Sequence, residues 1–354
     1  MNIKRLCVLF LILLVPGFLS SLEIKEGKIK LVLQEKNGRF SAYYLKDVKQ
    51  NKYVPLLFDQ DPRTTSLNIL EGNKVYKMGE ASGFQQTVEK TQEGARFVWK
   101  SAMLQVTEDF SFIRSQSSPL ANGFSITVSV KNLSDQDIYI GIRYILDTYL
   151  GEDANIHFNT GTNKNITTEK SYSAFSLPAF VVSTDGTADG LGFMVMAKNG
   201  GVTQPDQLVI ANWKRLNDSS WSFTANETRN FNLLPYSIND SALALYYNTA
   251  RLGKGEQKQI KLAMGAYISE GFSVSSSASE SPIASMFQNA IINEPKDGND
   301  IESAVKSDLL TISDLIEKIN SGLLNPGSIS EGDLNIIRQI IDELKKRKTR
   351  YDGQ

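Results

Sequence analysis

Histidine and cysteine are nearly missing from this chain of 354 residues, which contains one of each. The single histidine, His157, excludes any site built from two histidines, and the single cysteine, Cys7, excludes a disulfide framework. Zinc enzymes, thiol enzymes and most nucleophile–histidine pairs therefore have no support. The sequence patterns of phosphate-binding loops, dinucleotide-binding turns and nucleophile elbows are also absent. The sequence thus indicates no catalytic residue, no metal and no cofactor.

An excess of charge of one sign is lacking as well. The chain has 38 basic and 39 acidic residues, a net charge of −1, so we expect no nucleic-acid partner. One short basic cluster, residues 345–350, ends the last predicted helix, where the helix dipole favours cations. The cluster is a solvated helix end, or it contacts an acidic protein face, peptidoglycan acids or anionic lipid.

Long apolar runs are missing, with one exception at residues 6–15. Lys4 and Arg5 precede this run and Pro16-Gly17 follows it, which is typical of a secretory signal peptide at residues 1–21 with cleavage after Ser20 or Ser21. The run is shorter than the ~20 residues that a spanning helix needs. Cys7 lies inside the run and not at the cleavage point, which argues against a lipoprotein. We expect a periplasmic protein without a stable membrane span, because a thiol-free mature chain suits a bacterial periplasm.

Short alternating runs of apolar and polar residues fill the chain from residue 22 to about residue 270. Asn37-Gly38, a strong type I′ hairpin signal, joins the first two runs, 28–34 and 39–45. The other predicted strands are 95–100, 103–113, 124–130, 138–146, 179–183, 191–196, 208–213, 242–247 and 259–267. So many strands without helices between them predict a mainly β fold, a large antiparallel β-sandwich.

The composition changes after residue 270. Six of the nine residues from 273 to 281 are serine, which predicts a linker at 271–281. Beyond it, residues 282–354 have helical periodicity. Asn299 and Ser330 are predicted N-caps of two helices that form a hairpin, with Pro326-Gly327 between them. The apolar stripes expected on the three helices are Ile283, Met286, Phe287 and Ile291; then Ile301, Val305, Ile312, Ile316 and Ile319; then Leu334, Ile337, Ile341 and Leu344.

Two segments carry a family resemblance. The first is residues 130–151, VKNLSDQDIYIGIRYILDTYLG, and the second comprises residues 240–247, 252–257 and 260–267. Together they resemble the galactose mutarotase-like β-supersandwich proteins, over about residues 22–270. The RYILDT stretch also resembles uncharacterised periplasmic proteins of spirochaetes. The resemblance implies a fold and not an activity.

Mutarotase chemistry itself is not expected. In that family it resembles a general acid and a general base, usually His and Glu, with a second His nearby. This chain offers only His157.

Candidate binding residues cluster around the end of the run 138–146. Arg143 and Asp147 are four residues apart, so on a strand they share one face. They form either a structural ion pair or a polar patch on the concave sheet face that can bind a glycan. Glu152, Asp153 and His157 follow in a loop that has no metal-ligand spacing, and any catalytic centre is expected in this loop beside Asp147.

Tryptophans supply the remaining candidates. Trp213 and Trp221 flank Lys214-Arg215 and are either sugar-stacking platforms or packing residues.

Three classes of function follow. The leading one is a non-enzymatic periplasmic interaction protein, a rigid sandwich with a helical tail that binds an envelope or periplasmic partner through residues 282–354. The spirochaetal resemblance suggests an envelope assembly such as the periphery of the periplasmic flagellar motor. The alternatives are a carbohydrate-binding module and a glycan-active enzyme with paired carboxylates.

Overall fold

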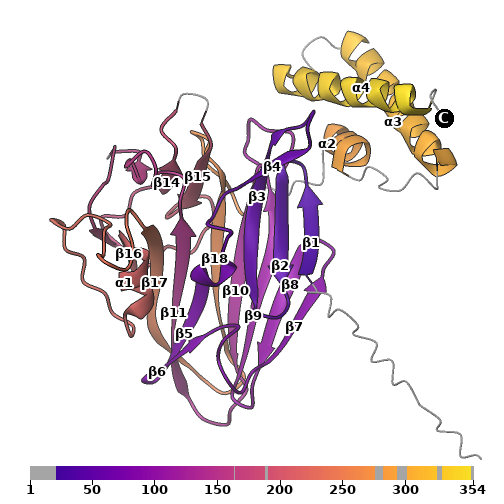
Figure 1. Ribbon diagram of the computed structural model, residues 1–354. Coiled ribbons are helices and arrows are strands. Elements are labelled where there is room, and N and C mark those ends of the chain that lie inside the picture. Colours follow the sequence, from indigo (N-terminus) through magenta and orange to yellow (C-terminus); the bar gives the residue numbers. More distant parts are fainter. Residues whose placement is uncertain are drawn as a thin grey trace, which may run out of the picture.

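Antiparallel strands dominate the computed structural model, which describes residues 21–162, 164–187, 190–275, 282–292, 301–324 and 329–351. A group of helices follows the strands at the C-terminal end (Figure 1). The mainly β fold class with a C-terminal helical region is therefore confirmed. The predicted signal peptide falls mostly on residues 1–20, which lie outside the described residues.

The strands form three sheets. The eight-stranded sheet has the order β12 (Phe158–Thr160), β14 (Phe180–Thr184), β15 (Gly192–Met196), β18 (Gln257–Ala266), β10 (Gly123–Asn132), β9 (Leu104–Ile113), β8 (Gly94–Lys100) and β7 (Gln85–Lys90). The six-stranded sheet has the order β13 (Lys170–Ser173), β16 (Gln207–Asn212), β17 (Ser241–Leu252), β11 (Ile138–Thr148), β5 (Ser66–Glu71) and β6 (Lys74–Lys77). The four-stranded sheet has the order β1 (Ser21–Glu26), β2 (Ile29–Gln34), β3 (Arg39–Asp47) and β4 (Lys52–Pro55).

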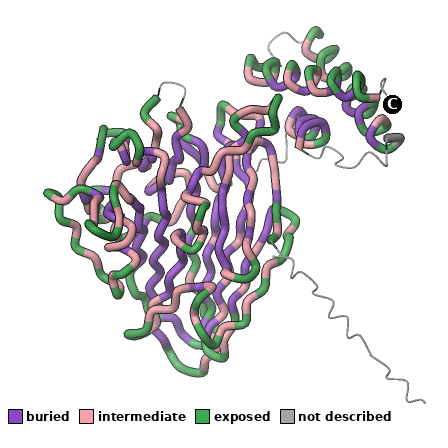
Figure 2. Tube along the Cα trace, in the orientation of Figure 1, coloured by how far each residue is buried: buried purple, intermediate pink, exposed green. Residues whose placement is uncertain are grey.

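One large hydrophobic core joins the three sheets. Buried residues run along the strands of all of them (Figure 2). Phe40 of the four-stranded sheet packs edge-on against Phe110 of the eight-stranded sheet, with ring centroids 4.9 Å apart. Tyr144 of the six-stranded sheet donates a hydrogen bond to the buried Glu108 of the eight-stranded sheet. The alternation of apolar and polar residues, which predicts the strands, therefore also places one face of each sheet in a shared interior.

The hairpin predicted at Asn37-Gly38 is present, but its turn is not the predicted type I′. Gln34 pairs with Arg39, which leaves four residues in the loop, and only Gly38 of the dipeptide has a positive φ, of 58°. Asn37 instead accepts a hydrogen bond from the Arg39 backbone N–H through its side-chain oxygen, at 3.1 Å. A type I′ turn would require a left-handed backbone at Asn37. Asn37 does not adopt it, and its side chain instead closes the turn through this hydrogen bond.

Several strands lacked a sequence signal. The unpredicted ones are β1, β4, β5, β6, β7, β12 and β13. Conversely, Trp213 was predicted as the last residue of a strand but begins α1 (Trp213–Asp218). Asn212 causes the change, because its side-chain oxygen accepts a hydrogen bond from the Arg215 backbone N–H at 3.2 Å and caps the helix. A short 3-10 helix, Pro62–Thr64, precedes β5.

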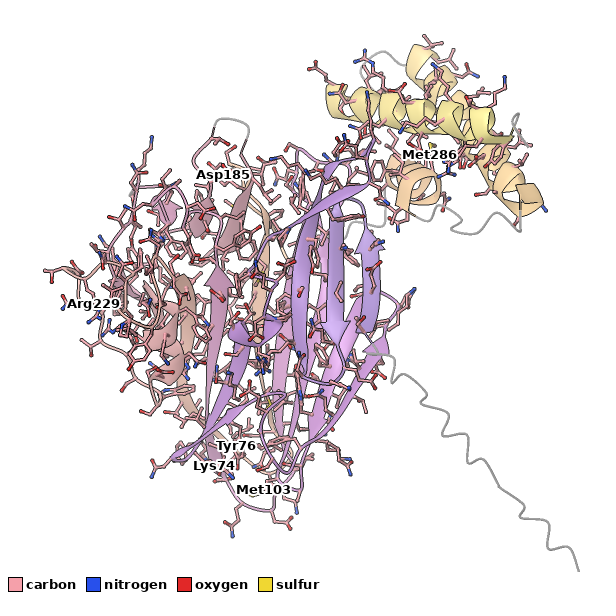
Figure 3. All side chains as sticks on the ribbon, in the orientation of Figure 1. Lys74, Tyr76, Met103, Asp185, Arg229 and Met286 are labelled. Atoms are coloured by element: carbon pink, nitrogen blue, oxygen red, sulfur yellow. The ribbon has the colours of Figure 1, made fainter. Side chains whose placement is uncertain are left out.

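The C-terminal helices pack on one end of the sandwich. They are α2 (Pro282–Phe287), the π-helical turn Gln288–Ile292, α3 (Ile301–Leu324) and α4 (Glu331–Tyr351). Their own hydrophobic cluster includes Leu45 and Leu120 from the sandwich. Met286 of α2 belongs to this cluster and lies on the side of α2 near α4 (Figure 3). Gln288 fastens the unit further, because its side-chain nitrogen donates to the Lys25 carbonyl at 2.9 Å. We call α2, the π-helical turn, α3 and α4 the helical unit.

The start of the predicted Ser-rich linker packs on the sandwich. Phe272 is buried against Gly123 and Gly265, and the Val274 N–H donates to the Gly200 carbonyl at 2.9 Å. Residues 276–281, like the predicted cap Asn299 and the predicted break Pro326-Gly327, lie outside the described residues.

The predicted N-cap of the last helix is confirmed. Ser330 accepts from the Asp333 N–H at 3.1 Å, and Asp333 accepts from the Ser330 N–H at 3.0 Å. Among the described helices, none is both long enough and apolar enough to cross a bilayer.

Candidate functional site

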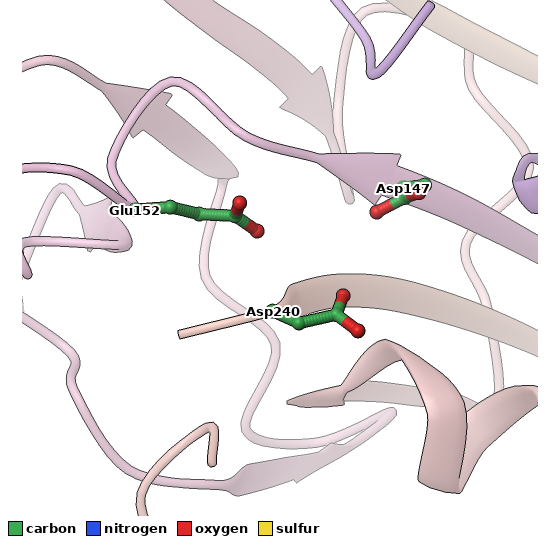
Figure 4. Close-up of side chains that lie close together, drawn as sticks. All are labelled: Asp147, Glu152 and Asp240. Carbon is green, nitrogen blue, oxygen red and sulfur yellow. The ribbon is translucent and has the colours of Figure 1, made fainter. Parts of the chain in front are cut away.

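Three carboxylates converge where β11 ends and β17 begins. They belong to Asp147, Glu152 and Asp240, and one oxygen of each lies within 4.8 Å of one oxygen of the others. Their side chains point toward one another from three separate segments of the chain (Figure 4). We call these three residues the carboxylate cluster.

Backbone hydrogen bonds hold two of the segments in place. Asp147 is the last residue but one of β11, and its N–H donates to the Thr65 hydroxyl at 3.1 Å. Asp240 immediately precedes β17, and its carbonyl accepts from the Trp213 N–H at 3.1 Å. Because β11 and β17 are paired neighbours, with Asp147 opposite Ala242, the end of one strand meets the start of the other.

Glu152 enters from the turn that follows β11. Its N–H donates to the Tyr149 carbonyl at 3.0 Å, which tightens the turn. Its carboxylate accepts from the Ser241 N–H at 2.8 Å, so the side chain is fixed beside the first residue of β17. Asp240 is the neighbour of Ser241 in the sequence, and this places the third carboxylate next to the second.

Burial and crowding raise the pKa values of the carboxylate cluster. Asp147 is 5% exposed, and desolvation, reinforced by the negative charges of Asp240 and Asp61, raises its pKa to about 8. Desolvation, followed by repulsion from Asp147 and Asp240, raises the pKa of Glu152 to about 8. Desolvation also raises the pKa of Asp240. At neutral pH the cluster therefore retains protons, or a cation balances its charge.

This geometry limits the chemistry that the cluster supports. A carboxyl group that stays protonated near pH 7 can act as a general acid. Glycosidases separate their two carboxyl groups by about 5–5.5 Å or about 6.5–9.5 Å, to leave room for the sugar or for water. The nearest carboxylate oxygens of the cluster lie within 4.8 Å of one another, close enough for each negative charge to raise the pKa of its neighbours. Three carboxylates also form an oxygen-rich donor set of the kind that suits Ca²⁺ or Mg²⁺.

His157 adjoins the cluster but is buried and neutral. Its Nδ1 lies 3.0 Å from the Ser241 hydroxyl and its Nε2 lies 3.2 Å from Asn155 Oδ1. Desolvation lowers its pKa to about 4, and its ring packs against Phe231 at 4.5 Å between centroids. The His157 ring therefore orients the Ser241 hydroxyl, and Ser241 in turn binds the Glu152 carboxylate. The sequence contains no second histidine that could form an acid–base pair with His157.

Arg143 lies apart from the carboxylate cluster. Arg143 and Asp147 share a face of β11, as predicted, yet no ion pair joins them among the described residues, because four residues of strand span about 13 Å. The Arg143 side chain is covered by Ser219 and Trp221, and its guanidinium carbon lies 5.4 Å from the centre of the Trp221 ring. The predicted structural ion pair with Asp147 is therefore wrong, and Arg143 is a packing residue beneath the segment that follows α1.

The other predicted binding residues, Trp213, Trp221 and Asp153, do not all lie at the carboxylate cluster. Trp213 borders the carboxylate cluster, since its indole nitrogen donates to the Thr64 carbonyl at 2.8 Å and its backbone N–H binds Asp240. Trp221 packs with Arg143, away from the cluster, and Asp153 is exposed in the turn. The sequence reasoning missed Asp240, although the residue opens the second segment that carries the family resemblance.

A second candidate surface is the outer face of α3. α3 buries four described side chains, and only Leu315 of these is large and apolar; the others are Ala304, Asp308 and Thr311. The other described Leu and Ile side chains of α3 are exposed, with Leu309 at 60% and Ile316 at 55%. The others exposed on α3 are Leu310, Ile312, Ile319, Leu323 and Leu324. A helix that buries an Asp and exposes its Ile and Leu residues has its apolar stripe uncovered.

That stripe forms one wall of a groove between α3 and α4. The groove has a volume of about 520 Å³. Its apolar walls include Leu309, Ile312, Ile316 and Ile319 of α3 and Ile341 and Leu344 of α4. Four members of the predicted stripe, Val305, Ile312, Ile316 and Ile319, are thus confirmed as a single face. The side chain of the fifth, Ile301, lies outside the described residues. The predicted inner face of α4 is partly wrong, because Leu334 is exposed. The buried face is centred on Ile340 and includes Ile336, Ile337, Leu344 and Arg347.

Comparisons with known proteins concern the sandwich. No protein-family model and no curated protein matches the chain. Among solved structures, a galactose mutarotase-related enzyme from Lactobacillus acidophilus is 12% identical, with a TM-score of 0.39, over 71% of this chain and 99% of that one. A galactose mutarotase-like protein from Lactobacillus casei is 11% identical, with a TM-score of 0.41, over 70% of this chain and 100% of that one. A polysaccharide lyase is 12% identical, with a TM-score of 0.39, over 70% of this chain and 33% of that one.

The first two of these structures are described as galactose mutarotase-related or mutarotase-like, the group that the two sequence segments resemble. At such identities and TM-scores they carry no information about activity. The resemblance to spirochaetal proteins stays a prediction.

Proposed function

We propose that this protein is an interaction protein, in which the β-sandwich holds the helical unit and the groove between α3 and α4 binds a partner. The observation that carries the proposal is the apolar stripe of α3. Leu309 and Ile316 are more than half exposed, while Asp308 and Thr311 of the same helix are buried. Exposed apolar area of this kind is disfavoured in water unless a partner covers it.

The sandwich suits the role of a rigid support. The helical unit buries Leu45 and Leu120 and is hydrogen-bonded through Gln288 to the turn between β1 and β2. The groove therefore has a fixed position on the body of the protein. Export to the periplasm, which we infer from residues 1–21, makes an envelope or periplasmic protein the partner. The periphery of the periplasmic flagellar motor is the setting that the sequence resemblance suggests.

A charge placed in the stripe tests the proposal. We expect Ile316→Glu to reduce stoichiometric capture of a defined envelope protein at least tenfold in a crosslinking pull-down, because a carboxylate cannot be buried in an apolar contact without a large desolvation cost. A point variant is preferred to deletion of residues 282–354, which would expose Leu45 and Leu120. The matched control is Ser313→Glu, an exposed residue on α3 that does not line the groove.

Unfolding midpoints of both variants should equal that of the wild type, since both side chains are exposed. The proposal fails if Ile316→Glu captures the same proteins in the same amounts as the wild type.

A second candidate function is carbohydrate binding at the carboxylate cluster. The specific observation is that the half-buried Trp213 borders the cluster through Thr64 and Asp240, because an indole face beside hydrogen-bonding carboxylates is a common platform for sugar rings. We expect Trp213 fluorescence to respond to peptidoglycan fragments or common oligosaccharides, and Asp240→Asn to weaken that response several-fold. Phe substitution of Trp221, away from the cluster, is the control. No response at millimolar ligand would rule this candidate out.

A further inference from the structure

The groove between α3 and α4 has the residue spacing of a helix-binding site. Its α3 wall has apolar residues at 305, 309, 312, 316 and 319, which alternate steps of four and three along the helix. This is the spacing of the seam between two packed helices. Leu315 and Leu344 are largely buried at its base, so the groove is concave and not a flat face. A concave apolar groove of this kind accepts the apolar face of an amphipathic helix.

Charge at the edge of the groove is positive. Three charged residues line it: Asp308, Lys345 and Lys348. Asp308 is neutralised within the helical unit, because its carboxylate accepts from Arg347 at 2.7 Å and from the Tyr351 hydroxyl at 2.9 Å. Lys345 is exposed on α4 and presents its charge at one end of the groove. The complement of this edge is a helix with acidic residues beside its apolar stripe.

From this we infer that the groove binds an amphipathic helix of a partner protein whose stripe is flanked by Asp or Glu residues at one end. The inference deepens the proposed function, on which it rests, by naming the chemistry of the partner. The concave shape argues against a bilayer as the occupant, because a flat membrane surface cannot reach Leu315 and Leu344 between two helices. Apolar contact supplies the affinity, and Lys345 selects the charge and the orientation.

Two synthetic amphipathic helices test the inference. Both have about five turns and the same Leu and Ile stripe, with Glu at the flanking positions of one and Lys at those of the other. Binding to the full chain is measured by fluorescence anisotropy. We expect the Glu peptide to bind at least tenfold more tightly than the Lys peptide, and we expect salt to reduce this preference.

Charge reversal on α4 supplies the decisive comparison. The variant Lys345→Glu should reverse the preference, so that the Lys peptide binds more tightly. Arg338→Glu is the matched control, because it makes the same type of charge change at an exposed α4 position outside the groove. Ile316→Glu should weaken both peptides at least tenfold.

Each other outcome overturns the inference in a distinguishable way. If both peptides bind equally and Ile316→Glu weakens both, the groove binds helices without charge selection, and the proposed function stands. If neither peptide binds but light scattering shows a dimer that Ile316→Glu dissociates, a second copy occupies the groove. If vesicles with anionic lipid bind and Ile316→Glu prevents it, the surface is a membrane contact, and the proposed function fails as well. If none of these binds, both fail.

Discussion

Replacing Asp147 with Asn should raise the free energy of unfolding by about 6 kcal/mol above pH 8 and change it little below pH 4. The carboxyl group has a pKa of about 8 in the folded protein and an ordinary value of 3.8, and desolvation is the main cause. Between these values the folded chain holds a proton that the unfolded chain releases. The stability that protonated Asp147 contributes is therefore complete below pH 3.8 and is lost as the pH rises through 8. Each pKa unit corresponds to about 1.4 kcal/mol.

Urea unfolding of wild type and Asp147→Asn across this range, with a chelator present, measures the difference. Asn is nearly isosteric with Asp and lacks the charge, so it keeps the packing and removes the penalty. Asp153→Asn is the control, because Asp153 is exposed in the same turn and should show no such pH dependence. A variant that is less stable than the wild type at every pH would show that an ionised Asp147 supports the fold, and would contradict this account of the carboxylate cluster.

Replacing Arg347 with Met should loosen the helical unit by about 3–5 kcal/mol and leave the sandwich folded. Arg347 is 2% exposed, and it donates to Asp308 at 2.7 Å and to the Ala290 carbonyl. Removing the arginine leaves the buried Asp308 carboxylate without its cation, and an uncompensated buried charge is among the most destabilising lesions in a protein. Hydrogen exchange should increase in α2, α3 and α4 and stay unchanged in β10 and β11.

Two further variants test whether the buried position and the unpaired Asp308 charge cause the loss of stability. Arg350→Met removes a cation from the same helix at a largely exposed position, so it should have an effect of at most about 1 kcal/mol. The double variant Asp308→Leu/Arg347→Met replaces both charges and should recover most of the lost stability. If Arg347→Met alone leaves exchange in α3 unchanged, the buried pair does not hold the helical unit together.

Most inner strands of the three sheets could be predicted from the sequence, whereas none of their edge strands could. β11 and β17 are rich in Ile, Leu and Tyr, so their alternation is clear. β7, with the sequence QQTVEK, lies at the edge of its sheet, and polar residues occupy both of its faces. An edge strand needs little apolar surface, because solvent covers one side of it. β5 is an inner strand and mostly buried, but it is short and follows a turn-rich segment, so its alternation is too brief to predict a strand.

The candidate site could be predicted in part, for a reason of topology. Asp147 and Glu152 are five residues apart, so a shared location follows from the sequence. Asp240 joins them only because β17 pairs with β11 across about ninety residues of intervening chain, a pairing that no local pattern indicates. The same limit applies to α3. Periodicity identified its apolar stripe, yet only the packing shows that Ala304 and Thr311 face inward and that the stripe stays open.

The separate hydrophobic cluster of the helical unit has a consequence for how binding and opening are linked. This cluster shares Leu45 and Leu120 with the sandwich, but its other buried members come from the helices themselves. The helices can therefore open as one cooperative segment while the larger core stays closed. A ligand in the groove binds only the closed segment, so its free energy of binding adds to the protection of α3 and α4 amides and not to that of the sheets. Occupancy of the groove becomes measurable from amide protection alone, even before the occupant has a name.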